Sequence, residues 1–213
     1  MLPLACITET ARTARHPARS AVTGRTGVRL RPQLPWGRKL DQGSPVMAIF
    51  RLNHAVLYVR DVAESVAFYR DVLGFDYIEG GDAHPKAAFL RAPGSTNDHD
   101  LGLFELGPEA GPSGAGRSTV GMYHLAWEVD TLGDLEDLAA KLSAAGALVG
   151  STNHGTTKSL YAKDPNGLEF EVVWIIPADL LTAEDRDGHG ALDLAAELAK
   201  YGRDARGGVG ISR

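Results

Sequence analysis

An internal repeat is the feature that most constrains the fold of this chain. Residues 53–61 read NHAVLYVRD and residues 123–131 read YHLAWEVDT. Both stretches are short and rich in β-branched and aromatic residues, which predicts a strand in each. Repetition at this spacing indicates one structural unit that is used twice.

A helix is predicted after each of these two strands, because a capping residue precedes and a glycine follows a stretch with apolar residues on one face. The predicted helices, with their caps and terminating glycines, are residues 62–73 (Asp61, Gly74) and the stretch up to Ala145 (Thr131 or Asp130, Gly146).

Three further strands follow each helix. They span residues 75–79, 87–91 and 101–106 in the first half and residues 147–152, 159–163 and 168–175 in the second. Each half is therefore a βαβββ unit. One four-stranded unit leaves a sheet face and two edges uncovered, so we expect the two units to pair. The predicted fold class is α+β, with two tandem βαβββ modules that form a curved mixed sheet around a cavity.

The expected domain organisation follows from these elements. It comprises residues 1–47 as a basic tail, 48–106 as the first module, 107–119 as a linker, 120–177 as the second module and 178–213 as a C-terminal extension with a helix near 191–201.

The first 47 residues differ in charge from the rest of the chain. They carry eight Lys and Arg residues against two acids, whereas the whole chain has a net charge of -5. Three interpretations remain open: a disordered tail, a targeting signal, or an upstream stretch preceding a true start at Met47.

Composition excludes several classes of protein. Cys6 is the only cysteine, so an internal disulfide or a thiolate metal site is excluded. The longest apolar run, residues 172–176, is far too short to cross a bilayer. The acidic balance gives no support to a nucleic-acid surface. We expect a cytoplasmic protein.

The histidines carry the strongest chemical signal. His54 and His124 occupy equivalent places in the two repeats, as the second residue of each opening strand, and Glu171 lies in the closing strand of the second repeat. Two imidazoles and one carboxylate can hold one face of a divalent cation and leave three positions open. The remaining histidines outside the modules' strands, His16, His84 and His189, are expected to be solvated.

A longer motif lies between residues 152 and 171. It contains His154, five residues, Leu160-Tyr161, two residues, Asp164-Pro165-Asn166-Gly167, three residues and Glu171. The motif resembles the signature of the type I extradiol ring-cleavage dioxygenases of the vicinal oxygen chelate superfamily. The resemblance covers about residues 50–176. The segment from Asp164 to Glu171 is shared with glyoxalase I and antibiotic-resistance proteins, whereas the spacing of His154 and Tyr161 is more specific to the dioxygenases.

The resemblance implies a role for six residues. His54, His124 and Glu171 would be the metal ligands, His154 and Tyr161 would hydrogen-bond the substrate and oxygen-derived atoms, and His99 would be the acid/base group. Gly102 departs from the family, which often has alanine there, and the stretch from His99 to His124 is longer than in many relatives. The implied metal is Fe(II), with Mn(II) as the alternative.

The implied partners are a small catechol-type ortho-diphenol and O2. Many relatives are oligomers, and a homo-oligomer is compatible with this sequence, which does not specify its surface. Asp164 and Asn166 are expected to shape a turn without touching the metal.

Two other functions remain open. Glu105 is expected to occupy the repeat position of Glu171 and to share a face with His99, Leu101 and Leu103. As a fourth ligand it would favour a glyoxalase-like lyase or isomerase. The other alternative is a non-catalytic protein that binds a drug or another small molecule.

Overall fold

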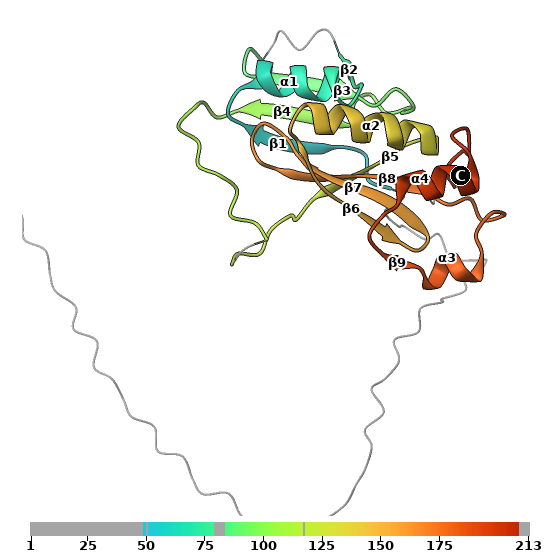
Figure 1. Cartoon of the computed structure of the whole chain (residues 1–213). Helices are drawn as coiled ribbons and strands as arrows, with labels where there is room; N and C mark the ends of the chain where they lie inside the picture. The colour runs from blue at the N-terminus through green and yellow to red at the C-terminus, as the bar shows by residue number, and fades with distance from the viewer. Residues whose placement is uncertain (1–48, 50, 79–83, 117, 209–213) are drawn as a thin grey trace, which may run out of the picture. The chain divides into compact units, whose positions relative to one another are not determined.

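The structure is a computed structural model, and it describes residues 49, 51–78, 84–116 and 118–208. The chain divides into two units, residues 1–47 and 48–213. The three interpretations of the basic tail concern residues outside the described part of the chain, as do Cys6 and His16. The second unit contains the elements shown in Figure 1, which are β1 (Ala55–Val59), α1 (Val62–Asp71), β2 (Asp76–Tyr77), β3 (Ala87–Arg91), β4 (Leu101–Glu105), β5 (Leu125–Glu128), α2 (Leu132–Ala144), β6 (Leu148–His154), β7 (Thr157–Lys163), β8 (Glu169–Ile175), α3 (Ala183–Asp187), β9 (His189–Gly190) and α4 (Leu194–Tyr201).

The two long helices begin where their caps predict. The Asp61 carboxylate accepts the backbone N–H of Glu64 at 2.8 Å at the start of α1. Thr131 forms a capping box with Asp134 at the start of α2. Such caps satisfy N–H groups that have no partner inside the helix. Gly74 follows α1 with a φ of 80°, a left-handed conformation that glycine adopts without strain.

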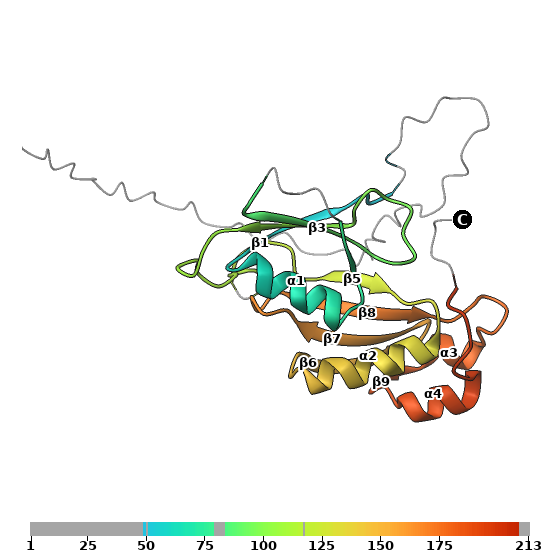
Figure 2. The same cartoon turned by 90° about the horizontal axis from the view of Figure 1, so that it is seen from above.

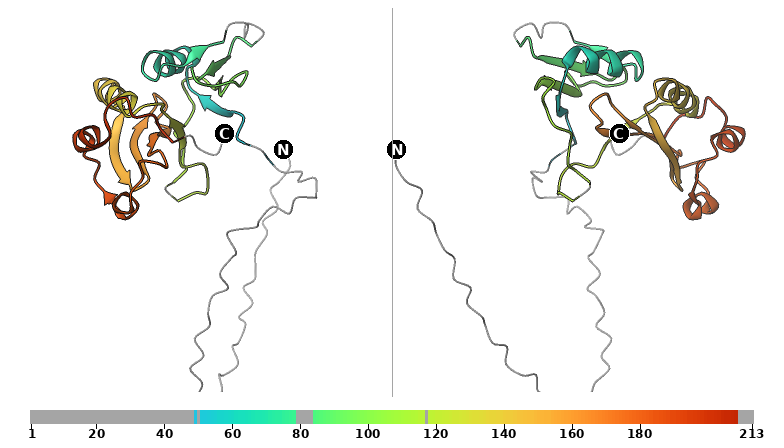
Figure 3. Two further views of the ribbon diagram at one scale, coloured as in Figure 1. Left: turned by 90° about the vertical axis from the view of Figure 1, so that its right-hand side faces the viewer. Right: turned by 60° about the vertical axis from the view of Figure 1, so that its left-hand side comes forward.

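The strands form two mixed sheets with the same internal order. The first sheet has the order β1-β4-β3-β2 and the second β5-β8-β7-β6-β9. In both, the opening strand pairs in parallel with the closing strand, and the other pairs are antiparallel. The predicted α+β class and the two βαβββ units are therefore confirmed. Figure 3 shows two separate sheets that do not close into a barrel.

One face of each sheet is covered by its own helix. Helix α1 packs on β2, β3 and β4, and α2 packs on β6, β7 and β8. The strand residues on these faces are fully buried, for example Leu101 and Leu103 in β4 and Leu160 in β7. Figure 2 gives a second view of the helices beside their sheets. The opposite faces are left open, and they are the faces on which a site can form.

Aromatic contacts join the two modules on the helical side. The ring of Phe68 in α1 lies 6.0 Å from Phe170 in β8, and Phe75 lies 5.1 Å from Trp127 in β5. Phe68 and Trp127 pack against the apolar clusters of both modules. The two modules therefore share a core, although their sheets are separate.

Several boundaries differ from the prediction. The opening strands begin at Ala55 and Leu125, so His54 and His124 each lie one residue before a strand. The strand predicted over residues 75–79 is only two residues long, within the residues that the structure describes. His189 is exposed, as expected, and it lies in the short strand β9, which pairs with the edge of β6. No helix within the described residues is long and apolar enough to cross a membrane.

Candidate metal centre

The second module brings four of the six predicted site residues together. On the open face of its sheet, the His124 Nε2 atom lies 3.1 Å from an Oε2 atom of Glu171. The side chain of Tyr161 lies next to this pair, and its ring centroid is 5.8 Å from that of His124. The Tyr161 hydroxyl lies 2.8 Å from the Nε2 atom of His154 and is hydrogen-bonded to it.

Strand register explains this cluster. Glu171 in β8 is paired with Ala126 in β5 on one side and with Tyr161 in β7 on the other. Side chains of directly paired residues point to the same face of a sheet. His124 is two residues before Ala126 and therefore projects from that same face. The ladder thus lines up a carboxylate, a phenol and an imidazole across three strands.

The surroundings of two tyrosines raise the pKa values of their phenols. Burial raises the pKa of Tyr161 above its ordinary value, and the neighbouring carboxylate of Glu171 raises it further. Tyr123 stands beside this cluster, and a hydrogen bond to Glu169 raises the pKa of that phenol as well. At neutral pH both hydroxyl groups are therefore hydrogen-bond donors.

The first module brings the other two residues together. The His54 and His99 rings lie 4.6 Å apart between centroids, and Phe89 from β3 packs 4.9 Å from His99. The His54 Nδ1 atom lies 2.8 Å from the side-chain oxygen of Asn53. A histidine that donates from Nδ1 to an amide oxygen presents Nε2 as a free lone pair, as metal-binding histidines do.

A buried amide holds this part of the chain in place. Asn97 is 9% exposed and donates to the Asn53 carbonyl at 2.7 Å and to the Asp100 carboxylate at 2.7 Å. Arg51 donates to the side-chain oxygen of Asn97. Asn97 therefore joins the segment that carries His54 to the loop that carries His99. This role of Asn97 was not predictable from the sequence, because an asparagine in a polar loop carries no distinguishing pattern.

The predicted orientation of His99 by strand alternation was wrong. Leu101 and Leu103 are fully buried on the helical face, whereas the His99 ring contacts His54 and Phe89 on the open face. The alternation breaks at Asp100, whose carboxylate accepts the N–H of Ala92 at 2.9 Å and so turns the chain before β4 begins. His99 thus reaches the open face through the loop geometry.

The predicted equivalence of Glu105 and Glu171 was also wrong. Residues 54 and 124 are equivalent in the repeat, so Val56 corresponds to Ala126. Val56 pairs with Gly102, and Ala126 pairs with Glu171. The position that corresponds to Glu171 is therefore Gly102, which has no side chain. Glu105 pairs with Val59.

The contacts of Glu105 place it outside the site. One carboxylate oxygen lies 3.6 Å from the Lys86 amine, and the other accepts the Val62 N–H at 3.5 Å, at the start of α1. Glu105 thus belongs to the helix terminus, where a carboxylate is favoured by the helix dipole. A four-ligand site would require a carboxylate at position 102 in the first module, where this chain has glycine.

The donor set of the second module fits a divalent cation. Two ligands bonded at about 2.0–2.2 Å to one ion lie about 3 Å apart when they are neighbours, which is the separation of the His124 and Glu171 atoms. The Nδ1 atom of His124 is buried and lacks a hydrogen-bond partner among the described residues. Within that part of the chain, no three potential ligands are close enough to form a complete site. The candidate ligands therefore lie in two groups, with His54 in the first module and His124 with Glu171 in the second.

A turn of the second module reaches across to the first. Asp164 accepts the N–H groups of Asn166 and Leu168 at 2.8 and 2.9 Å, which shapes the turn as expected. Asn166 also accepts the Arg60 N–H at 2.8 Å and donates to the Ser65 hydroxyl at 3.0 Å. This second role of the turn was not predicted from the sequence. We call the turn the clasp (Asp164–Gly167).

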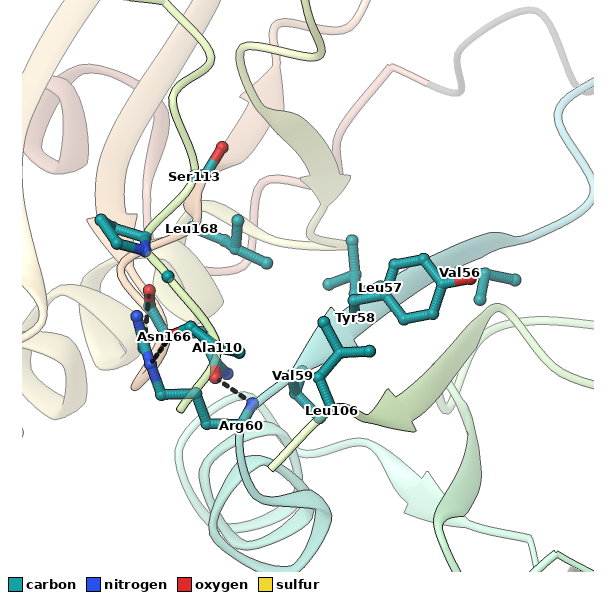
Figure 4. A pocket seen from close by; sticks show the side chains of 12 residues that line it. Val56, Leu57, Tyr58, Val59, Arg60, Leu106, Ala110, Ser113, Asn166 and Leu168 are labelled. Atoms are coloured by element: carbon teal, nitrogen blue, oxygen red, sulfur yellow. Dashed lines mark hydrogen bonds between the residues drawn. The ribbon is translucent and has the colours of Figure 1, made fainter. Parts of the chain in front are cut away.

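Figure 4 shows the clasp beside a cavity of about 260 Å³ at the end of β1. The Arg60 guanidinium donates to the backbone carbonyls of Ala110 and Asn166, at 3.0 and 3.3 Å. Tyr69 donates to Asp164 at 3.4 Å, and burial together with this carboxylate raises the pKa of the phenol. The clasp therefore fixes the position of the first module through buried polar contacts.

Comparison with known proteins agrees with this architecture. The model of the Glyoxalase/Bleomycin resistance protein/Dioxygenase superfamily matches residues 51–172, and the chain belongs to this superfamily. A domain of the same description from Frankia sp. EAN1pec has a TM-score of 0.50 at 22% identity, covering 59% of this chain and 92% of that domain. At that identity the likeness concerns the fold alone.

Two curated relatives carry more specific names. Biphenyl-2,3-diol 1,2-dioxygenase 3 of Rhodococcus globerulus is 34% identical over 128 residues, which are 57% of this chain and 62% of the relative. The manganese-dependent 2,3-dihydroxybiphenyl 1,2-dioxygenase of Geobacillus genomosp. 3 is 28% identical over 130 residues, which are 59% of this chain and 37% of the relative. This chain therefore spans only part of the length of both relatives.

Proposed function

We propose that this protein is a metal-dependent extradiol dioxygenase that cleaves the ring of a small catechol-type ortho-diphenol with O2. The observation that carries the proposal is the His124–Glu171 pair, which stands beside Tyr161 and His154 on one open sheet face. The names of the two relatives support a diol as the substrate. We propose His54 as the third ligand and Fe(II) as the metal, and Mn(II) suits the same ligands.

The bound metal would hold both diol oxygens and O2 on one ion and carry electron density between them. Gly102 supports this use of the centre, because its lack of a side chain leaves room for a bidentate substrate. A carboxylate at that position would suit a lyase instead.

His99 has the position of a proton acceptor. Its ring lies beside the proposed ligand His54, and its side chain is 21% exposed, so it borders the open face without being sealed in the core. A neutral imidazole there can take the proton of a diol hydroxyl and return it later in the reaction. His99 therefore fills the acid/base role.

Tyr161 and His154 would hold the oxygen atoms of the substrate. The Tyr161 hydroxyl can donate a hydrogen bond to a substrate oxygen. His154 is hydrogen-bonded to that hydroxyl and fixes its direction. The pair thus orients the substrate and stabilises charge on its oxygen.

An apolar wall on the first sheet would receive the aromatic ring. Val56 and Tyr58 of β1 are 50% and 69% exposed on the same face as His54. Phe89 and Phe104 lie on this face as well, with ring centroids 6.1 Å apart. Exposed apolar side chains next to a polar cluster are typical of a small-molecule site.

The test is anaerobic loading with Fe(II) or Mn(II), metal analysis, and addition of catechol and O2 while the yellow ring-fission product is followed. We expect His54→Ala and Glu171→Ala to lose both metal and product, whereas Glu105→Gln, the matched carboxylate control, keeps both. Loss of metal in Glu105→Gln would favour the lyase. Metal retention by the unaltered protein without any product from a panel of catechols would overturn the proposed dioxygenase.

A further inference from the structure

The residues after the family match form an extension that binds to the second module. The match ends at residue 172, and α3, β9 and α4 follow it. Strand β9 pairs with the outer edge of β6, where Gly190 faces Asn153 and His189 faces His154. The extension therefore meets the sheet at the residue proposed to support Tyr161.

A second contact lies at the turn that follows His154. Gly155 has a φ of 80°, and a Cβ atom at this position would lie 2.7 Å from the Asp185 carbonyl oxygen and 3.2 Å from that of Arg186. Both carbonyls belong to α3. The close approach requires glycine, and it fixes the turn against the extension.

A third contact is a buried ion pair. Lys158 is 1% exposed, and its Nζ atom lies 2.9 Å from an Oε1 atom of Glu197 in α4. The same amine donates to the Asn153 side-chain oxygen at 2.8 Å and to the Gly155 carbonyl at 3.4 Å. One ammonium group thus joins the extension to both neighbours of His154.

The ion pair lies on the side of the sheet away from the candidate metal centre. Lys158 pairs with Asn153 across the β6–β7 ladder, so both side chains share the helical face. His154 is the next residue and points to the open face, where it meets Tyr161. Lys158 cannot reach the substrate, and any effect on the site passes through the backbone of residues 153–155.

We infer that the buried Lys158–Glu197 pair is a positioning device, by which the C-terminal extension holds His154 in hydrogen-bonding contact with Tyr161. The inference rests on the proposed function for what His154 does in the reaction. The geometry that holds His154 is independent of the reaction. Burying two charges costs free energy, and replacing a buried ion pair by well-packed apolar side chains is often neutral or stabilising. Stability alone therefore does not account for this pair, which favours a role in positioning.

The test uses a variant that removes both charges, Lys158→Met/Glu197→Leu, because loss of one partner alone would leave a buried unpaired charge. Arg203→Met is the matched control. Arg203 also joins the extension to the second module, but its ion pairs are with Glu136 and Asp137 of α2 and not with the β6–β7 turn.

The first readout is the ¹⁵N chemical shifts of the His154 ring, which report its tautomer and its hydrogen bond to Tyr161. The effect of Tyr161→Phe on the His154 shifts is measured in three backgrounds. We expect Tyr161→Phe to change the shifts in the otherwise unaltered protein and in Arg203→Met, but not in Lys158→Met/Glu197→Leu. His154 shifts that are the same in the double variant and the unaltered protein would overturn the inference, whether or not the protein cleaves catechols.

The second readout is ring cleavage. We expect Lys158→Met/Glu197→Leu to lower kcat/KM by about 10- to 100-fold at unchanged metal content, the usual effect of groups that support a site from outside. Combined with His154→Ala, the double variant should cause no further loss. Equal losses with and without His154 would indicate a general structural role and overturn the inference.

Discussion

At the scale of single residues, the two modules differ at one equivalent pair of positions on the open face, Gly102 and Glu171. Both lie on the open face, paired with Val56 and Ala126. A Cβ atom at Gly102 would lie 3.4 Å from Val56 and 3.5 Å from Phe89, which is close to ordinary van der Waals contact. A Cβ atom there is accommodated, and a longer side chain would project over the same face as the proposed metal ligands.

Gly102→Glu should therefore convert the open centre into a more fully ligated one. We expect metal to be retained and ring cleavage to fall by about 10²-fold or more, since the added carboxylate competes with the diol for its place. Metal analysis and the oxygen-dependent assay measure both effects. Gly102→Ala is the control and should keep activity, and full activity in Gly102→Glu would show that this position lies away from the substrate.

His99→Gln tests the acid/base role at the same scale. The amide keeps a polar side chain beside His54 but cannot take up a proton, so turnover should fall by about 10² to 10⁴ while metal content stays constant. The measurement is steady-state ring cleavage with parallel metal analysis. Loss of metal in His99→Gln would assign this residue to the ligand set.

At the scale of elements, the clasp turn (Asp164–Gly167) links the modules through polar contacts. Asn166→Ala removes the acceptor for the Arg60 N–H and the donor to Ser65. Each lost hydrogen-bond partner costs about 1–3 kcal/mol, so the loss of these two should lower the free energy of unfolding by about 2–6 kcal/mol. Chemical denaturation measures it, with Pro165→Ala in the exposed part of the same turn as the control.

Hydrogen exchange localises the effect of the same substitution. Amides at the start of α1 should exchange faster in Asn166→Ala, whereas those of β7 should be unchanged. Faster exchange throughout both modules would mean that the turn supports the whole fold and not the junction.

Elements were predictable from the sequence where a local signal defines them. Asp61 and Thr131 start their helices through their own side chains, and the repeat predicted both βαβββ units. Register was not predictable in this way. Glu105 has the right residue type in the right strand, but β1 and β4 pair so that Gly102 takes the equivalent place. Alternation also failed at His99, because Asp100 accepts hydrogen bonds from Ala92 and Asn97 in the loop between β3 and β4, and no strand pattern predicts these contacts.

At the scale of the whole molecule, the proposed ligands come from both modules. His54 belongs to the first, and His124 and Glu171 belong to the second. The modules share a core through Phe68 and Trp127, yet no ladder joins their sheets within the part of the chain that the structure describes. A metal bound by all three ligands would therefore add a link between the two open faces, opposite the shared core.

This arrangement predicts that metal stabilises the protein only when both modules supply ligands. At a metal concentration about 100 times the Kd, binding to the folded state alone adds about 2.7 kcal/mol to the free energy of unfolding. Thermal unfolding with increasing Mn(II) should show this rise for the unaltered protein and for His189→Ala, whose imidazole lies in β9 outside the proposed ligand set. His54→Ala should lose most of the rise, because the two remaining ligands belong to one module. A full rise in His54→Ala would show that His124 and Glu171 bind the ion without the first module, and it would limit the metal centre to the second sheet.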